Sequence, residues 1–211
     1  MENVYYRKGE YQKAVEYYFE AMRLKPRSTD IHYNFGNAYK ALGDHGEAFK
    51  SFDRAARLKP GFRRAENKIA GILFEQGKFK AAIRQLQQIV VSNPRDAKAY
   101  SDLGSVSYRL KQYGKVIDYY EKAIDLKEDY TEAYSNLGSA YGKLKEHEKG
   151  IESYQTAIRI KPKFPGAYYG LGVTYAALGR RQEAAACFRK VLELDPGYSK
   201  GDAIRKWLGK E

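Results

Sequence analysis

Apolar residues recur along the chain at helical spacing, in short stretches that end at glycine or proline. In residues 29–62, one stretch ends at Gly43 and a second ends at Pro60. The apolar positions are Ile31, Phe35, Ala38, Tyr39 and Leu42 in the first stretch and Ala48, Phe49, Phe52, Ala55, Ala56 and Leu58 in the second. Residues three or four apart share one helix face, glycine favours a turn and proline cannot continue a helix. The pattern therefore predicts two amphipathic helices joined by a tight turn.

The same pattern returns every 34 residues without an insertion or deletion. The predicted full units are residues 29–62, 63–96, 97–130, 131–164 and 165–198. Small residues such as Gly36 allow the two helices of a unit to approach closely, and large residues such as Phe52 fill the remaining space. A fixed period of this length is typical of a solenoid, in which each unit buries its apolar face against its neighbours. We expect an all-α fold and a single domain over residues 1–211.

The two ends of the chain depart from the full unit. Residues 1–28 match only part of it, as if Met1 entered the first helix midway, so we expect an exposed apolar edge there. Residues 199–211 follow the last unit, and Ser199 to Leu208 predict one amphipathic capping helix. We expect Trp207 to pack against the last unit, because a solenoid needs a cap with a polar outer face.

The recurring slots of the unit carry a resemblance to a known family. In three units these slots hold His32, Phe35, Gly36, Tyr39, Ala48, Phe52, Ala55 and Pro60; Tyr134, Leu137, Gly138, Tyr141, Tyr154, Ala157 and Pro162; and Tyr168, Leu171, Gly172, Tyr175, Ala184, Phe188 and Pro196. This pattern resembles the tetratricopeptide repeat (TPR) over essentially the whole chain, with departures in residues 63–96 and 97–130. The resemblance implies a right-handed superhelix of antiparallel helix hairpins. It also implies a concave groove, lined mainly by the first helix of each unit, that binds proteins or peptides.

Composition adds a basic balance and narrows the class of protein. The chain has 38 Lys and Arg against 26 Asp and Glu, a formal net charge of +12, and 43% hydrophobic residues, which is typical of a soluble folding chain. No apolar run is long enough to span a membrane, and the first residues lack the features of a signal peptide. The single cysteine, Cys187, suits a reducing compartment, so we expect a cytoplasmic protein.

The sequence offers no constellation for catalysis. His32 occupies an aromatic core slot, and His45 and His147 occupy the same slot three units apart, too far from each other to share a metal ion. Cys187 lies on an apolar helix stripe, and no glycine-rich phosphate loop is present. We therefore expect a non-enzymatic protein without a metal or cofactor.

Candidate groove residues are the first-helix positions that helical spacing turns away from the second helix. They are Tyr33, Asn34, Asn37, Arg64, Asn67, Lys68, Lys98, Ser101, Arg109, Asn136, Lys143 and Tyr169. The basic residues Arg64, Lys68, Lys98 and Arg109 form a predicted cluster at the centre of the groove. Asparagine can hydrogen-bond a peptide backbone through both amide atoms, and a basic channel suits an extended acidic or polar segment. The alternative is that these are ordinary solvated side chains.

Other functional interpretations are weaker. The clamp by which some TPR proteins hold chaperone tails is not matched, since Tyr33 and Lys68 stand where a lysine and an asparagine are needed. A self-assembling scaffold, like the TPR protein that coats magnetosomes, is the second interpretation and would use the partial unit at the start. A third is a TPR arm of a larger enzyme that resembles O-GlcNAc transferase, although Lys68, Asp102 and Gly170 interrupt its asparagine series. The net charge predicts only non-specific, salt-sensitive affinity for nucleic acid.

Overall fold

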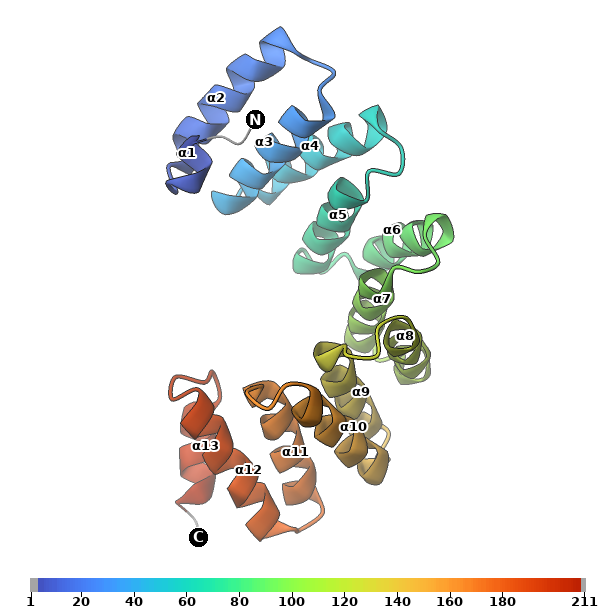
Figure 1. Cartoon of the computed structure of the whole chain (residues 1–211), viewed down its shortest axis with the longest axis vertical. Coiled ribbons are helices and arrows are strands. Elements are labelled where there is room, and N and C mark those ends of the chain that lie inside the picture. The colour runs from blue at the N-terminus through green and yellow to red at the C-terminus, as the bar shows by residue number, and fades with distance from the viewer. Residues whose placement is uncertain (1–3, 210–211) are drawn as a thin grey trace. The chain divides into compact units, whose positions relative to one another are not determined.

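The computed structural model describes residues 4–209. Over this range the regular secondary structure is entirely helical, and short turns join the helices (Figure 1). These residues divide into two compact units, with the boundary between Pro94 and Arg95. Unit 1 contains α1 (Val4–Arg7), α2 (Tyr11–Leu24), α3 (Thr29–Ala41), α4 (His45–Leu58), α5 (Arg63–Glu75) and α6 (Phe79–Ser92). Unit 2 contains α7 (Ala97–Arg109), α8 (Tyr113–Leu126), α9 (Thr131–Lys143), α10 (His147–Ile160), α11 (Pro165–Ala177), α12 (Arg181–Leu194) and α13 (Gly201–Leu208). The predicted all-α fold of stacked helix hairpins is confirmed.

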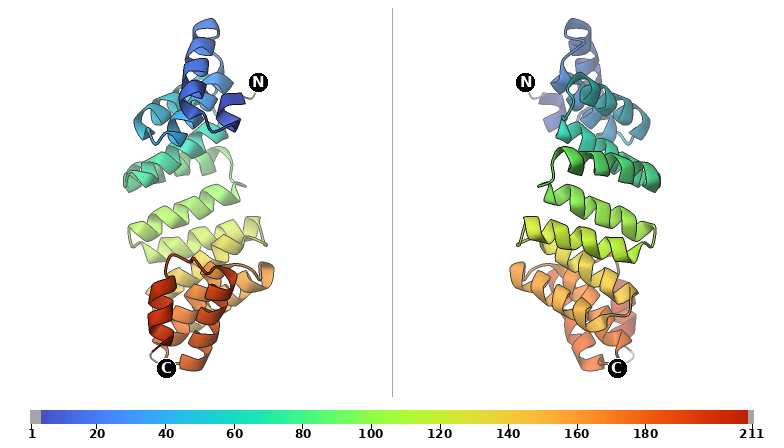
Figure 2. Two further views of the ribbon diagram at one scale, coloured as in Figure 1. Left: turned by 90° about the vertical axis from the view of Figure 1, so that its left-hand side faces the viewer. Right: turned by 90° about the vertical axis from the view of Figure 1, so that its right-hand side faces the viewer.

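Each predicted 34-residue unit contains one pair of helices that pack against each other. In unit 2, every helix also contacts the next one along the chain, from α7 to α13 (Figure 2). Direct contacts also join α9 to α7 and to α11, the first helices of neighbouring hairpins. Because α10 runs antiparallel to both α9 and α11, these two first helices run in the same direction.

The turn inside each hairpin places one residue in the left-handed backbone region. Gly43 and Gly179 adopt φ values of 81° and 73°, as expected for glycine. The same slot in the hairpins α7–α8 and α9–α10 is occupied by Lys111 and Lys145, with φ values of 59° and 63°. The turn geometry is therefore imposed by the hairpin even where the residue disfavours it.

Close approach of the two helices depends on a glycine that faces an aromatic ring. A Cβ atom on Gly36 would lie 2.8 Å from the ring of Phe52, and one on Gly138 would lie 2.9 Å from the ring of Tyr154. Both distances are too short for a real Cβ atom. The predicted complementarity of small and large residues between the two helices is confirmed.

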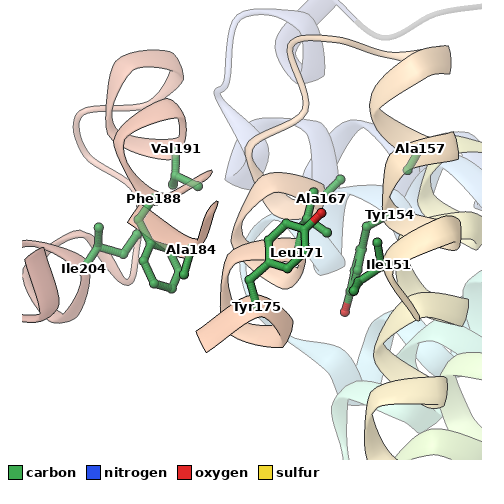
Figure 3. Packing of buried hydrophobic residues seen from close by; sticks show 10 residues of the cluster. All are labelled: Ile151, Tyr154, Ala157, Ala167, Leu171, Tyr175, Ala184, Phe188, Val191 and Ile204. Carbon is green, nitrogen blue, oxygen red and sulfur yellow. The ribbon is translucent and has the colours of Figure 1, made fainter. Parts of the chain in front are cut away.

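One apolar cluster of unit 2 is layered along its helices. Leu171 and Tyr175 of α11 lie between Tyr154 of α10 and Phe188 of α12 (Figure 3). The helix α13 closes this cluster with buried Ile204, while the Trp207 ring packs edge-on against Phe188 at a centroid distance of 5.0 Å. The predicted capping helix is present, although it begins at Gly201, two residues later than expected.

Candidate functional site

The first helices of unit 2 enclose a hollow of about 550 Å³. We call it the α9–α11 groove and define it by the residues of these two helices that line it. They are Ser135, Asn136, Ser139, Gly142 and Lys143 on α9, and Gly166, Tyr169, Gly170, Val173, Thr174 and Ala177 on α11. Further walls come from α7, from α10 and from the loops that follow α10 and α12. Ligand-binding pockets in proteins typically have volumes of roughly 300–1,000 Å³, so the hollow is large enough for several residues of a peptide.

One end of the groove is aromatic. Phe164 and Tyr198, from the loops after α10 and α12, line it together with Tyr169 near the start of α11. The rings of Tyr169 and Tyr198 have centroids 5.5 Å apart, and Tyr169 also packs against Phe188. We call these three lining residues, Phe164, Tyr169 and Tyr198, the aromatic end.

The middle of the groove contains a pair of hydroxyl groups. Tyr154, from α10, brings its hydroxyl to within 2.9 Å of Ser139 Oγ on α9, at hydrogen-bond distance. Burial raises the pKa of Tyr154, although the bond with Ser139 opposes this, so the phenol keeps its proton near neutral pH. Two hydroxyl groups that each donate and accept can hydrogen-bond either the N–H or the C=O of a bound backbone.

Gly170 makes room for this hydroxyl pair. A Cβ atom on Gly170 would lie 2.3 Å from the Tyr154 ring and 2.7 Å from its hydroxyl oxygen. The same slot holds Asn136 one unit earlier. The loss of a side chain at Gly170 therefore allows the end of the Tyr154 ring to reach the groove.

The far end of the groove carries a cation. Lys143, at the end of α9, is exposed and makes no ion pair with any described residue. His147, the first residue of α10, lines the groove beside it. None of the described lining residues is Asp or Glu. We call Lys143 the cationic end, and because no carboxylate of the described residues lines the groove, its lining is positive on balance.

Asn136, Lys143 and Tyr169 are the predicted groove residues that the structure brings together in the α9–α11 groove. Two other predicted groove residues are largely buried, and their role in binding stays a prediction. Tyr33 is only 7% exposed, because its ring packs between Phe52 and Phe62 at centroid distances of 5.5 and 5.4 Å. Ser101 is 5% exposed, because its short side chain stays within the packed surface of α7.

The predicted basic cluster is divided between the two units and is partly engaged within each. Arg64 of α5 places its guanidinium 4.5 Å from the centroid of the Tyr33 ring. Lys98 of α7 forms an ion pair with Asp102 one turn later, with Nζ 2.7 Å from Oδ2. Lys68 belongs to unit 1 and Arg109 to unit 2. A shared basic surface formed by these residues stays a prediction.

The remaining predicted residues are in unit 1 and lie outside the α9–α11 groove. Asn34 lines a separate hollow of about 310 Å³ between α2 and α3. Asn37 and Asn67 are half-buried, and Asn67 Oδ1 has no hydrogen-bond partner among the described residues. Their role in binding stays a prediction.

Tyr154 occupies a recurring aromatic slot of the repeat, and its position in the sequence does not by itself predict that its hydroxyl reaches the groove. A signal for it exists in the sequence. Serine and tyrosine occur together, fifteen positions apart, in two hairpins, as Ser105 with Tyr120 and as Ser139 with Tyr154. Both pairs are at hydrogen-bond distance in the structure. At Phe52, where the aromatic residue has no hydroxyl, the partner slot holds Asn37 instead.

Residues 4–209 offer no second kind of site of the types considered next. No group of three or more His, Cys, Asp or Glu side chains in this range could hold a metal ion. None of the described helices is long and apolar enough to cross a membrane. Burial raises the pKa of the Cys187 thiol to about 11, so it is a poor nucleophile near neutral pH.

A stack of helix hairpins with a groove on its first helices defines a class of repeat protein that binds other proteins. Family models agree with this class. Models described as TPR repeat match residues 3–43 and 143–179, and models described as tetratricopeptide repeat match residues 29–62, 68–131 and 165–198. The chain belongs to the tetratricopeptide repeat family.

Several solved structures are similar to this chain. The crystal structure of MamA is 32% identical, covers 78% of this chain and 96% of its own, and has a TM-score of 0.68. MamA from Desulfovibrio magneticus RS-1 is 23% identical, with coverages of 81% and 97% and a TM-score of 0.71. YrrB, a TPR protein with an unusual peptide-binding site, is 20% identical, with coverages of 91% and 99% and a TM-score of 0.66. The last two show a shared fold. None of the curated proteins matches the chain significantly.

Proposed function

We propose that this protein is a non-enzymatic interaction module that binds an extended polar or acidic segment of another protein in the α9–α11 groove. The observation that carries the proposal is the groove itself, a hollow of about 550 Å³ walled by the first helices of consecutive hairpins. YrrB supports it to the extent that the same fold can carry a peptide-binding site.

The lining of the groove favours a peptide over a small apolar molecule. Asn136 and the hydroxyl pair of Ser139 and Tyr154 offer donors and acceptors along its middle. An extended backbone exposes an N–H and a C=O at each residue, and these need such partners when they leave water.

Charge favours an acidic or neutral segment. Lys143 is unpaired, and the described lining contains no carboxylate that would repel an acidic ligand. A basic ligand would bring its own cation beside Lys143 without compensation.

A substitution that places a large side chain in the groove, at a position with open space, tests the proposal. Gly142 lies on the groove, and a Cβ atom there meets no atom within 4 Å. Gly142→Tyr should therefore fold normally and weaken binding of peptides selected from a random library by about tenfold or more, as measured by fluorescence anisotropy. Gly114→Tyr is the matched control, because Gly114 on α8 is equally open and lies outside the groove. Equal loss in both variants, or no loss in Gly142→Tyr, would contradict the proposal.

A second candidate function, self-association, is favoured by the exposed apolar surface of the first two helices. Val4, Tyr5, Tyr6, Tyr17, Phe19 and Leu24 are large apolar residues that lie exposed on α1 and α2. Tyr17 and Leu24 also line the hollow between α2 and α3. Several exposed large apolar residues on two helices in contact commonly mark a protein interface, and a second copy of the chain is the occupant that we propose.

Sedimentation over a concentration series tests this candidate. Leu24 and Val91 are 84% and 81% exposed, so Leu24→Lys and Val91→Lys make the same change at two exposed sites. Self-association through α2 predicts that the wild-type mass rises with concentration, that Leu24→Lys stays monomeric and that Val91→Lys behaves as wild type. A wild-type monomer at every concentration would exclude the candidate.

The other two interpretations have less support. An arm of an O-GlcNAc-transferase-like enzyme would use an asparagine series, which Lys68, Asp102 and Gly170 interrupt. A cytoplasmic location stays a prediction from the single cysteine, Cys187.

A further inference from the structure

We propose that the α9–α11 groove recognises a two-point motif, in which an aromatic or large aliphatic side chain lies three or four positions from an acidic one. This inference rests on the proposed function and adds the chemistry and spacing of the partner. It follows from the different character of the two ends of the groove and from the length of helix between them.

The aromatic end supplies the apolar anchor point. Phe164, Tyr169 and Tyr198 line it, and the contact between Tyr169 and Tyr198 holds both of their rings in place. Lys161 Nζ lies 5.5 Å from the centroid of the Phe164 ring, so the Tyr169 and Tyr198 rings are the main apolar contact surface. Aromatic pairs prefer tilted or edge-on geometries, which leave a third ring or a branched aliphatic side chain a surface to pack on.

The cationic end supplies the second anchor point. Lys143 is the single lysine or arginine among the described lining residues, and it is exposed and unpaired. The neighbouring side chains at this end, including Ala177 on α11, are small or neutral. A carboxylate that docks here gains an ion pair and displaces no existing one.

Helix geometry sets the distance between the two points. Ser135 occupies on α9 the slot that Tyr169 occupies on α11, so it marks the level of the aromatic end. From Ser135 to Lys143 the helix advances eight residues, or about 12 Å at roughly 1.5 Å per residue. An extended peptide advances roughly 3.3 Å per residue, so the same distance corresponds to about three or four residues.

The middle of the groove suits the backbone of the intervening residues. Asn136 and the hydroxyl pair lie between the two ends, and both can bind a peptide group without selecting a side chain. We therefore expect the groove to specify the ends of the motif and to tolerate variation between them.

The test is a selection of random twelve-residue peptides displayed on phage, carried out on the immobilised full chain. The wild type should enrich peptides with an aromatic or large aliphatic residue three or four positions from Asp or Glu, in either chain direction. Lys143→Glu should lose the acidic preference and weaken the selected wild-type peptides by about tenfold. Lys122→Glu is the control with the same charge change, since Lys122 is exposed on α8 and outside the groove.

The outcomes separate this inference from the proposed function. Enriched peptides that compete with one another and are blocked by Gly142→Tyr, but that lack the acidic residue or the spacing, would overturn the two-point motif and leave groove binding intact. An equal effect of Lys143→Glu and Lys122→Glu would also overturn the motif, because the preference would then reflect net charge. No enrichment over the bare support would overturn both.

Discussion

Tyr120 and Tyr154 are buried tyrosines at the same position of consecutive repeat units, but only the hydroxyl of Tyr154 faces the groove. Tyr120 and Tyr154 lie one unit apart, and each has its hydroxyl beside a serine hydroxyl of its own hairpin. Asn136 fills the slot opposite Tyr120, whereas Gly170 leaves the slot opposite Tyr154 without a side chain. A single missing side chain therefore decides whether this hydroxyl pair faces a neighbouring helix or a groove.

The buried phenol of Tyr120 should make stability depend on pH in the alkaline range. Burial is the main cause that raises its pKa from 10.0 to about 12. Because the folded protein then holds this proton more tightly than the unfolded chain, the free energy of unfolding should fall as pH rises above 10. The fall due to Tyr120 should be about 1.4 kcal/mol by pH 11.

Urea unfolding of the wild type and of Tyr120→Phe at pH 9, 10 and 11 would measure this contribution. The variant lacks the titrating group, so the unfolding free energy of the wild type should fall relative to that of the variant by about 1.4 kcal/mol between pH 9 and pH 11. Other groups titrate alike in both proteins and cancel. A difference that stays constant across this range would contradict the buried phenol.

At the scale of the helix pair, the turn slot decides how easily a hairpin closes. Gly43 and Gly179 meet the left-handed requirement without steric cost, but Lys111 and Lys145 meet it with a Cβ atom present. A non-glycine residue in this region costs on the order of 1–3 kcal/mol, partly offset by the larger entropy that glycine loses on folding.

Replacement of either lysine by glycine should therefore stabilise the protein. We expect Lys111→Gly and Lys145→Gly each to raise the free energy of unfolding by about 1 kcal/mol, measured by urea denaturation. Gly43→Lys makes the reverse change in an equivalent turn and should lower it by a similar amount. The interpretation is wrong if glycine at position 111 or 145 destabilises the fold.

The hairpins themselves could be predicted from sequence because their signals are local. Helical spacing, the turn glycine and the terminal proline lie within one unit, and the 34-residue period supplies several copies of each. The burial of Tyr33 could not be predicted from such local signals. It depends on Phe62, which lies 29 residues later and folds back over the ring.

The groove was only partly predictable for a related reason. Asn136, Lys143 and Tyr169 were found because they sit on the outward face of a first helix. The hydroxyl of Tyr154 reaches the groove from a second helix, and it does so only because Gly170, in the next hairpin, lacks a side chain. The recurring pair of serine and tyrosine predicts the hydroxyl contact, but only the three-helix arrangement shows that this hydroxyl faces the groove.

At the scale of the whole molecule, the net charge of +12 is a poor guide to the site. Many of the cations are already satisfied locally, as Lys98 is by Asp102 and Lys149 is by Glu146. Surface pairs of this kind contribute little to stability, but they remove charge that a ligand would otherwise meet. What distinguishes the α9–α11 groove is an unpaired lysine beside neutral walls.

The partition of the groove between hairpins has a consequence for protein engineering. Ser139 and Tyr154 belong to residues 131–164, while Gly170 and Tyr169 belong to residues 165–198. A graft of the first block alone into another repeat protein would transfer the hydroxyls but place an unrelated side chain over them. The smallest cassette that carries the hydroxyl pair and the aromatic end is the two blocks together, residues 131–198, with the loop aromatic Tyr198 as its last residue; the wall from Tyr108 on α7 lies outside it.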